Sequence, residues 1–478
     1  MGNEGSETPD STDEVGEGEP VPTQRREAGV REIEPLGGNM AGTQEPEGMS
    51  TKVQRIAELA RAYPARAFVS LAHVMDRAWL YEAYRRTRKD GAVGIDGQTA
   101  AMYEADLDAN LADLLERLKS GRYRAPAVRR VQIPKADGRK RPIGIPTLED
   151  KVAQRAVVMV LEAIYEQDFL ACSYGFRPGR SPQQALDALW SHLKAMRGGW
   201  VVEIDIQSFF DELDKGALRE MLDERVRDGV IRKLIDKWLT AGVVENGQVL
   251  RPEKGTPQGG VVSPLLANIY LHVVLDRWFS HEVKPRLQGR GELIRFADDA
   301  VMVFANERDA RRVMAVLPKR MTRFGLRLHP EKTKLLSFRP RPSQTGGEEG
   351  GRSFDFLGFT HFWALNRHGY WVVKQKTASG RLQRSLDAIK AYCRRYRHRP
   401  VWEQHRALSL MLRGHYGYFG RAGNHAALAR LHAHTRLIWV KWLGRRSQRS
   451  RMSWTKAGAI LSRFPLPRPR TAWSGGIT

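Results

Sequence analysis

Three aspartates that follow apolar segments are the residues of this sequence best suited to catalysis. Asp298 and Asp299 form a tight turn after the largely apolar segment 293–296, and Asp205 lies at the end of the largely apolar segment 201–206. A carboxylate in apolar surroundings is costly unless it is paired or binds a metal ion. Three such ligands can hold two Mg²⁺ ions ~4 Å apart, which activate a hydroxyl and neutralise a leaving pyrophosphate. A solvated turn explains the Asp-Asp pair taken alone, and Asp205 makes the metal site the favoured hypothesis.

A basic hairpin and a glycine-rich loop are two further segments of interest. Between residues 128 and 145, short apolar stretches broken by prolines and an Asp-Gly pair predict a hairpin with a basic tip. The tip carries Lys135 and Arg141, whose point charge and planar guanidinium suit phosphate oxygens. For Arg139 and Lys140, charge that only keeps the hairpin soluble is a real alternative. Gln258 lies in the loop 255–260, where glycines permit a close backbone approach, but as a generic Pro/Gly loop this segment means little by itself.

The elements that must position these residues indicate an α+β fold. Apolar residues recur at helical spacing in residues 53–88, 148–165 and 182–196. Short apolar runs typical of strands occupy residues 200–206, 293–296, 300–304 and part of 354–373. Strands mixed with helices at this spacing favour an α+β core over an all-α or all-β fold.

Length and charge restrict the class of protein. With 478 residues the chain is long enough for about three domains, and 78 Lys and Arg against 54 Asp and Glu give a net charge of +24. Residues 1–50 hold 12 acids and 3 bases, which leaves +33 on the remainder, and residues 374–478 hold 23 bases, 2 acids and many interleaved aromatic residues. Such an excess predicts a polyanionic partner, and nucleic acid fits better than a membrane surface.

Several classes of protein are disfavoured by what the sequence lacks. Cys172 and Cys393 are too few for a disulfide framework or a zinc site of paired cysteines, so a reducing, cytoplasmic compartment is expected. The first thirty residues do not resemble a secretory signal, and the uncharged run 255–275 contains prolines and polar residues that do not suit a membrane span. Residues 1–52 are predicted to be a disordered acidic tail.

The ordered set of motifs resembles the bacterial group II intron-encoded reverse transcriptases and maturases. The similarity extends from about Leu71 to the C-terminus. Its motifs are Gly94-Ile-Asp-Gly97, Ile133-Pro-Lys-Ala-Asp-Gly-Arg-Lys-Arg-Pro142, Tyr174-Gly-Phe-Arg-Pro178, the Asp205 strand, Gly255-Thr-Pro-Gln-Gly-Gly260, Phe296-Ala-Asp-Asp299, His329-Pro-Glu-Lys-Thr333 and Phe356-Leu-Gly-Phe359. One departure is Phe296, where the family usually has tyrosine; the change keeps the ring and is expected to keep activity.

The resemblance implies a right-hand polymerase followed by an α-helical thumb. The implied divisions are the acidic tail 1–52, fingers with N-terminal helices and part of the palm at 53–200, the palm with an antiparallel sheet and the catalytic carboxylates at 201–373, the thumb or maturase domain X at 374–443, and a short basic DNA-binding tail at 444–478. The chain ends at Thr478 with no cysteine after Cys393. We therefore expect the endonuclease-lacking type, which does not cut the second DNA strand itself.

The resemblance also assigns roles to individual residues. It implies that Asp205, Asp298 and Asp299 are catalytic and bind two Mg²⁺ ions, that Lys135, Arg141, Phe210, Gln258 and Lys332 bind the nucleotide, and that Phe356, Leu357 and Gly358 form the primer grip. The Phe210 ring would crowd a ribose 2′-hydroxyl and so select deoxynucleotides, and Lys332 could protonate the leaving pyrophosphate. A core aromatic and a surface charge are the alternative interpretations of these two residues.

The basic C-terminal region implies a nucleic-acid surface. Candidates for phosphate contact there are Arg413, Arg421, Arg445 and Arg446. The implied function is an RNA-directed DNA polymerase that binds its parent group II intron RNA, promotes its splicing and copies it into DNA. Its expected partners are the intron RNA, the target DNA with its primer strand, and dNTPs; no membrane partner is expected. A splicing-only maturase and a reverse transcriptase domesticated for defence or repair are the alternatives, and the oligomeric state stays open.

Overall fold

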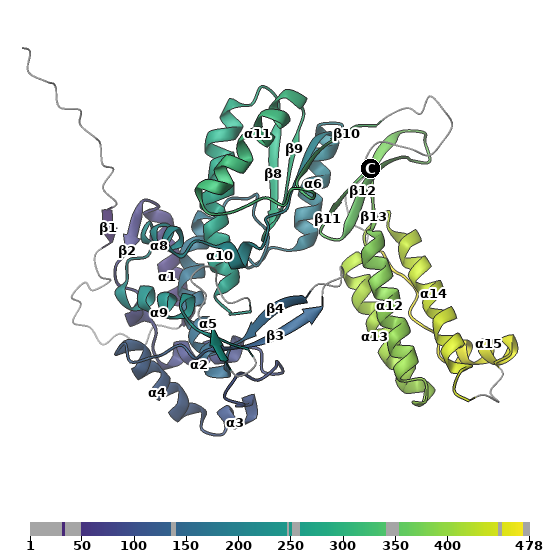
Figure 1. Cartoon of the computed structure of the whole chain (residues 1–478), viewed down its shortest axis with the longest axis horizontal. Coiled ribbons are helices and arrows are strands. Elements are labelled where there is room, and N and C mark those ends of the chain that lie inside the picture. The colour runs from purple at the N-terminus through teal and green to yellow at the C-terminus, as the bar shows by residue number, and fades with distance from the viewer. Residues whose placement is uncertain are drawn as a thin grey trace, which may run out of the picture.

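The protein folds as a set of helices with four small β-sheets, an α+β architecture (Figure 1). The computed structural model describes residues 31–33, 49–134, 140–245, 248–250, 259–340, 353–447 and 452–471. Nearly all of the predicted acidic tail and part of the predicted basic tail lie outside these residues. In the part of the chain that the structure describes, no helix is both long and apolar enough to cross a membrane.

A buried helix organises the first part of the fold. Helix α5 (Leu148–Asp168) begins at Thr147, whose side chain accepts a hydrogen bond from the Asp150 amide, and its buried residues lie on all sides. Helices α1 (Met49–Ala62) and α2 (Arg77–Arg86) pack against it. The remaining elements of this part are β1 (Arg31–Ile33), β2 (Arg66–Phe68), η1 (Ala72–Val74), α3 (Ala100–Glu104), α4 (Leu107–Lys119), α7 (Phe209–Glu212), α8 (Lys215–Asp223) and α9 (Gly229–Leu239).

A four-stranded antiparallel sheet lies at the centre of the fold. Its strands, in spatial order, are β10 (Lys334–Phe338), β5 (Gly199–Ile204), β9 (Asp299–Phe304) and β8 (Gly291–Phe296). Alternate residues of the strands enter two different cores, one shared with α11 (Glu307–Arg323) and the other with α6 (Pro182–Ala195). Because both faces are covered, the strands read as continuous apolar runs, which is why the sequence predicted them well.

Helices α10 (Ser263–Leu271) and η2 (His272–Val283), a π-helix, follow one another in the chain and contribute to the larger core.

Two other sheets extend the fold. The strands β3 (Val128–Pro134) and β4 (Lys140–Ile145) form the predicted basic hairpin and join β6 (Val243–Glu245) and β7 (Gln248–Leu250). The antiparallel sheet of β11 (Phe354–Phe356), β12 (Phe359–Leu365) and β13 (Trp371–Thr377) leads into the C-terminal helices.

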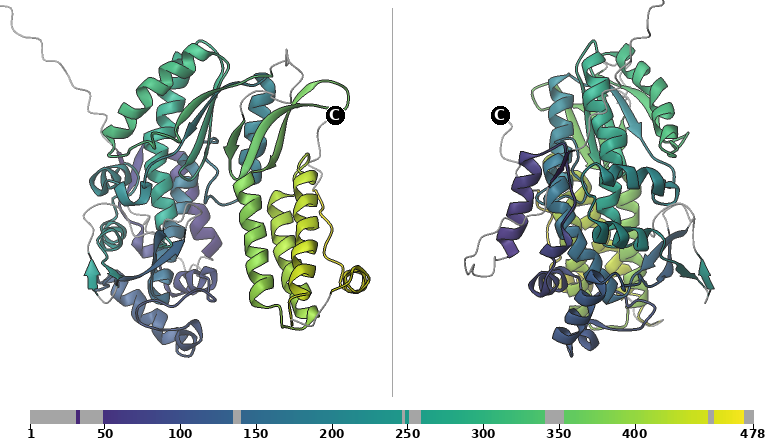
Figure 2. Two further views of the ribbon diagram at one scale, coloured as in Figure 1. Left: turned by 45° about the vertical axis from the view of Figure 1, so that its right-hand side comes forward. Right: turned by 90° about the vertical axis from the view of Figure 1, so that its left-hand side faces the viewer.

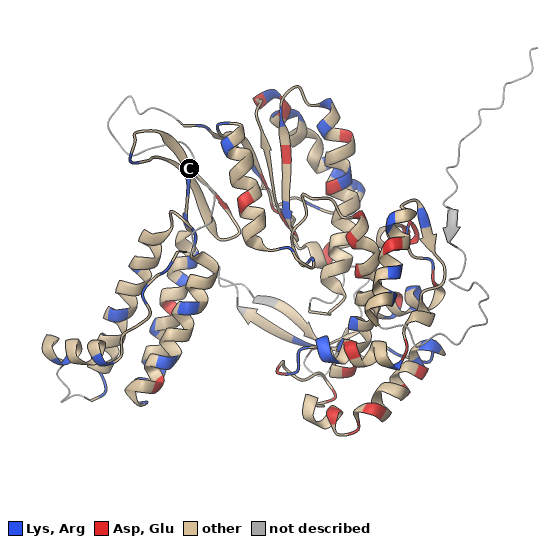
Figure 3. Ribbon diagram, turned by 180° about the vertical axis from the view of Figure 1, so that it is seen from behind, with Lys and Arg blue, Asp and Glu red and all other residues tan. Residues whose placement is uncertain are grey.

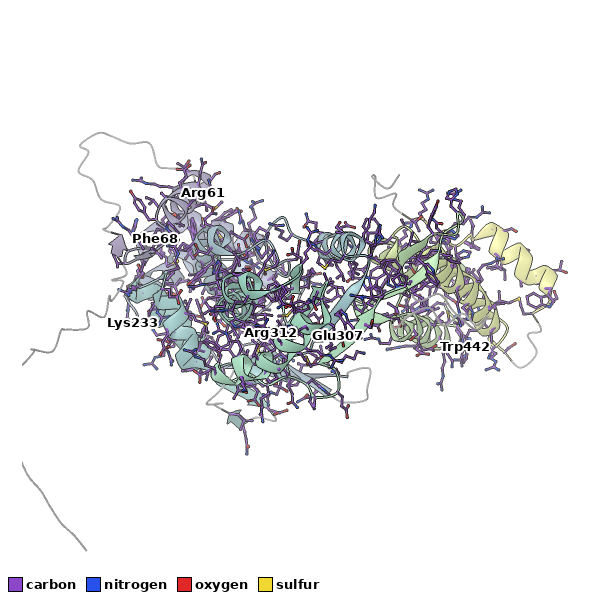
Figure 4. All side chains as sticks on the ribbon, turned by 90° about the horizontal axis from the view of Figure 1, so that it is seen from above. Arg61, Phe68, Lys233, Glu307, Arg312 and Trp442 are labelled. Carbon is purple, nitrogen blue, oxygen red and sulfur yellow. The ribbon has the colours of Figure 1, made fainter. Side chains whose placement is uncertain are left out.

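The C-terminal helices stand beside the rest of the molecule, as the left view of Figure 2 shows. Helix α12 (Ser379–Arg395) packs against α13 (Val401–Phe419) and α14 (His425–Leu443), and α15 (Trp454–Arg463) follows. Trp439 is fully buried among them. Viewed from above, Trp442 lies at the opposite end of the molecule from Arg61 and Phe68 (Figure 4).

Candidate active site

The turn that carries Asp298 and Asp299 joins β8 to β9. Phe296 pairs with Asp299 across the two strands, so Ala297 and Asp298 are the turn residues. Ala297 has a φ of 55°, the left-handed conformation that tight hairpin turns favour because it matches the twist of the strands. Asp298 is half-buried and Asp299 is exposed. Both carboxylates are therefore accessible to solvent at one end of the sheet.

Asp205 joins this pair through the register of the sheet. It directly follows β5, whose last residue Ile204 pairs with Ala300, the residue after Asp299. Two backbone contacts hold it: its amide donates to Thr333 Oγ1 (3.2 Å), and its carbonyl accepts from the His329 amide (2.8 Å). The three aspartates, 94 residues apart at their widest separation in the sequence, are thus brought to the same end of the sheet by strand pairing.

The pKa of Asp299 reflects the closeness of the three carboxylates. Loss of surrounding water and the nearby carboxylates of Asp298 and Asp205 raise the pKa of Asp299 to about 6, even though part of the residue is exposed to solvent. The positive charges of Arg381 and Lys332 act in the opposite direction, and Lys332 Nζ lies 3.2 Å from Asp205 Oδ2. A bound cation would relieve the remaining repulsion among the carboxylates.

A turn with two left-handed residues lies next to the C-terminal helices. Phe356 is buried at the end of β11, while Leu357 and Gly358 have φ values of 50° and 81°. The Tyr418 hydroxyl of α13 donates to the Leu357 carbonyl (2.9 Å). A Cβ atom on Gly358 would lie 3.4 Å from Cγ and Nε of Arg381, so the turn passes against the first turn of α12. Backbone strain of this kind persists only where neighbouring groups hold it.

Comparison with known proteins decides the family. The model of the family "Reverse transcriptase (RNA-dependent DNA polymerase)" matches residues 133–361, which include all three aspartates. Over 256 residues the chain is 37% identical to "Protein YkfC" of Escherichia coli, covering 47% of this chain and 67% of that protein. The chain belongs to the reverse transcriptase family.

Intron-encoded proteins are among the relatives of this reverse transcriptase. It is 39% identical over 193 residues to "Group II intron-encoded protein LtrA" of Lactococcus lactis, covering 40% of this chain and 32% of LtrA. It is also 39% identical over 182 residues to the "Uncharacterized 91 kDa protein in cob intron" of Schizosaccharomyces pombe, covering 38% of this chain and 22% of that protein. The resemblance to group II intron-encoded reverse transcriptases and maturases is thereby confirmed, and the chain matches at most a third of the length of these two intron-encoded proteins.

The carboxylate oxygens of the three aspartates are suitable ligands for a divalent metal ion. Among the described residues, no three His, Cys, Asp or Glu side chains form a ready-made metal cage. Mg²⁺ is usually held by one or two carboxylates, with water and substrate phosphates completing its shell, so it needs no such cage. The three carboxylates lie at a solvent-accessible end of the sheet, where water and substrate phosphates can complete the coordination of Mg²⁺.

Phe210 and Lys332 are two other predicted site residues. Phe210 follows Asp205 closely in the sequence, and Lys332 lies close to it in space. Phe210 is half-buried on α7, edge-to-face with Phe209 at a ring distance of 5.3 Å, and Ser208 before them has a φ of 46°. Part of the Phe210 ring is therefore core, as the alternative interpretation had it, and part is accessible. Lys332 is exposed and contacts Asp205, so it is more than an isolated surface charge.

The remaining nucleotide-binding candidates are described only in part. Lys135 and Gln258 lie outside the described residues, and only the backbone of Arg141 is placed, paired with Ile133 in the β3–β4 hairpin. Next to Gln258, Gly259 has a φ of 115°, and a Cβ atom there would lie 2.2 Å from the Gly144 carbonyl oxygen. The end of the Gln258 loop therefore packs tightly on β4, the strand that carries Arg141.

The four predicted RNA-binding arginines fall into two groups. Arg413 is exposed on α13, and Arg445 is exposed with its guanidinium 5.4 Å from the centre of the Trp442 ring. Arg421 instead forms an ion pair with Asp187 of α6, and Arg446 donates to the carbonyls of residues 397 and 399, both at 2.7 Å. The last two therefore make contacts within the protein that the sequence did not predict.

Sequence reasoning missed the residues that support the aspartate turn from behind. Arg295 is fully buried in β8 and pairs with fully buried Asp276, and it also donates to the side chain of Asn268. An arginine inside an apolar strand is the signal that could have identified the cluster. Its partner could not have been found in this way, because nothing in the sequence indicates that residues 276 and 295 meet.

Proposed function

We propose that this protein is an RNA-directed DNA polymerase that also binds its parent group II intron RNA, promotes its splicing and copies it into DNA. The observation that carries the proposal is the convergence of Asp205, Asp298 and Asp299 at one solvent-accessible end of the central sheet. The family membership of residues 133–361 supports it. The two cysteines are free, in keeping with a cytoplasmic site of action.

The three aspartates would hold two Mg²⁺ ions. Such ions lower the pKa of an attacking 3′-hydroxyl and neutralise charge on the leaving pyrophosphate. The contribution of the chain is to fix the ligands: β5 and β9 set the spacing of Asp205 and Asp299, and the contact of Lys332 with Asp205 places an ammonium beside the carboxylates. There the ammonium can donate a proton to the departing phosphate oxygen.

The arrangement of elements supports a right-hand polymerase. Residues 53–200 are assigned to the fingers and part of the palm, 201–373 to the palm, 374–443 to the thumb and 444–478 to a short DNA-binding tail. The antiparallel sheet β10-β5-β9-β8 suits a palm because it presents the carboxylates at one end. The three-helix group α12, α13 and α14 suits a thumb because it follows the β11–β13 sheet directly and stands apart from the fingers.

We assign substrate contacts to the remaining candidate residues of the site. Phe210 selects deoxynucleotides, the hairpin residues Lys135 and Arg141 bind the triphosphate, and Gln258 approaches the nucleotide from its glycine loop. The turn of Phe356, Leu357 and Gly358 holds the primer end. Its support by Tyr418 of α13 favours this role, because a thumb helix then steadies the turn that the primer touches.

The basic helices are proposed to bind intron RNA. Acidic side chains are sparse on α12, α13 and α14, as Figure 3 shows, and the helices carry many Lys and Arg side chains. Arg413 and Arg445, being exposed, are the better placed of the four arginines to contact phosphates, and Trp442 beneath Arg445 offers a ring for stacking. A phosphate-binding surface of this kind serves a structured RNA and a template–primer duplex alike.

Primer extension tests the proposal. The purified protein is expected to extend oligo(dT) on poly(rA) with Mg²⁺ and dTTP. Asp298→Asn keeps the shape of the turn but removes a metal ligand, so the extension rate is expected to fall by ~10³-fold or more. Asp108→Asn, at an exposed carboxylate of α4 remote from the central sheet, is the matched control and is expected to leave the rate unchanged.

Two results would decide against the polymerase. They are the absence of extension by the intact protein at several salt concentrations despite tight RNA binding, or equal extension by Asp298→Asn. The first result would favour the splicing-only maturase, which an assay of intron self-splicing at low Mg²⁺ with and without the protein then examines.

A further inference from the structure

A fully buried ion pair lies directly behind the aspartate turn. Arg295 Nε donates to Asp276 Oδ1 (2.7 Å) and Arg295 Nη2 donates to Asp276 Oδ2 (2.6 Å), with no solvent exposure of either side chain. Burying two charges costs much of what their attraction returns, so apolar residues of the same volume would stabilise a core as well or better. Stability alone therefore gives no reason for this pair.

The remaining donors of the arginine show what it holds. Nη1 donates to the Ala297 carbonyl (3.0 Å) and to Asn268 Oδ1 (2.9 Å), while Nη2 also donates to Ser173 Oγ (2.7 Å). All five N–H groups of the guanidinium are thus used. One of them reaches the main chain of the turn itself, at the residue before Asp298.

The same cluster holds the loop that contains Tyr174, Gly175 and Phe176. Asn268 Nδ2 donates to the Gly175 carbonyl (2.6 Å), and the Tyr174 amide donates to the Arg295 carbonyl (2.8 Å). Gly175 has room for no side chain, because a Cβ atom would lie 2.2 Å from the Ala297 amide nitrogen. The loop and the turn are therefore pressed together main chain against main chain.

An aromatic pair extends this contact to the surface. Phe176 has a φ of 56°, an unfavourable conformation for a bulky residue, yet the residue is 60% exposed. Its ring lies 6.3 Å from that of Phe296, the residue that begins the aspartate turn. Strain that displays an aromatic ring beside a catalytic turn is typical of a functional constraint.

We propose that Arg295 is a positioning residue of the polymerase site. It sets the position of Asp298 and Asp299 through the Ala297 carbonyl, and it ties that turn to the Phe176 loop through Asn268 and Ser173. Asp276 fixes the plane of the guanidinium, which a single point charge could not do. This inference rests on the proposed polymerase function for its consequence in catalysis, but it makes a separate prediction about metal binding.

The test compares Arg295→Lys with Arg225→Lys in the full chain. Arg225 is a matched control because it is also buried, pairs with Asp168 and donates to backbone carbonyls, far from the aspartates in the first part of the fold. Lysine keeps the charge opposite each aspartate but cannot reproduce the planar fork. Both variants are expected to lower the melting temperature, so stability by itself does not distinguish them.

Mn²⁺ binding followed by electron paramagnetic resonance is the deciding measurement. Arg295→Lys is expected to weaken Mn²⁺ binding about 10- to 100-fold, as is typical when a group that orients a metal ligand is lost, whereas Arg225→Lys leaves it unchanged. In primer extension, Arg295→Lys is expected to lower kcat by roughly 10²-fold with little change in the KM for dTTP. If folded Arg295→Lys binds Mn²⁺ and extends primers as the wild type does, the inference is wrong.

Two further outcomes are separated by the design. If Arg295→Lys does not fold, Asn268→Ala removes a single support of the guanidinium and of the Gly175 carbonyl, and it is expected to weaken Mn²⁺ binding by a smaller factor; wild-type binding would overturn the inference. If the wild type binds Mn²⁺ but extends no primer, the polymerase proposal is wrong. The role of Arg295 in positioning the metal site is then still tested by the Mn²⁺ binding of the variants.

Discussion

Replacing Gly175 with alanine tests how closely the aspartate turn is packed. The added Cβ atom would lie 2.2 Å from the Ala297 amide nitrogen and 2.9 Å from the Phe296 carbonyl carbon. Both are main-chain atoms, so no side-chain rotation can relieve the overlap. One backbone segment must move by about 1 Å before the contact reaches ordinary van der Waals distance.

The size of the effect follows from this displacement. Overpacking a rigid site costs about 1–3 kcal/mol of unfolding free energy. A shift of ~1 Å in catalytic groups can lower the rate about 10²-fold, and the atoms that move here belong to Phe296 and Ala297, the two residues before Asp298. We therefore expect Gly175→Ala to lower both the free energy of unfolding, measured by urea denaturation, and kcat for single-nucleotide primer extension.

Gly91→Ala is the control, since a Cβ atom at Gly91 meets no atom within 4 Å; its effect on unfolding is expected to stay within about 0.5 kcal/mol. Wild-type stability and wild-type kcat in Gly175→Ala would refute the packing argument. A loss of stability with an unchanged kcat per folded molecule would show that the loop yields and the aspartate turn does not.

Three other predictions concern the site and the C-terminal helices. The Mg²⁺ concentration that gives half-maximal extension should rise as the pH falls through about 6, because the pKa of Asp299 is raised to about 6 and a protonated carboxyl binds no cation; a constant value would contradict this. Phe210→Ala should increase incorporation of UTP relative to dTTP, and an unchanged ratio in competition assays would remove Phe210 from sugar selection. Trp439→Ala deletes a fully buried ring that donates to Gln404 (3.1 Å), so unfolding free energy should fall by about 3–5 kcal/mol; a loss below ~1 kcal/mol would show that the helices repack.

Much of the secondary structure around the site was predictable because its periodicity is strong. The strands at residues 200–206, 293–296 and 300–304 were confirmed as β5, β8 and β9 with small differences at their ends. Asp205, expected within its strand, lies one residue beyond β5, and Asp299 is the first residue of β9. Such boundaries depend on hydrogen bonds between strands, which the pattern of apolar residues does not encode.

The arginines show where prediction from single residues stopped. Arg421 and Arg446 carry the same charge as Arg413 and Arg445, so nothing in composition separates them. Arg421 has a partner in Asp187 only because α6 packs near the C-terminal helices. Arg446 donates to the carbonyls of residues 397 and 399 only because the end of α14 lies near them. A side chain's availability is a property of its neighbours in space.

The sequence by itself determined the residue types of the candidate active site, the order of the motifs, the basic C-terminal region and the α+β class, since these depend on local pattern and composition. The tertiary structure alone decided that Asp205 meets Asp298 and Asp299, through the pairing of β5 with β9, and that a buried Arg295–Asp276 pair supports their turn. The physical reason is that register and burial arise from contacts between segments far apart in the chain, which no local pattern contains.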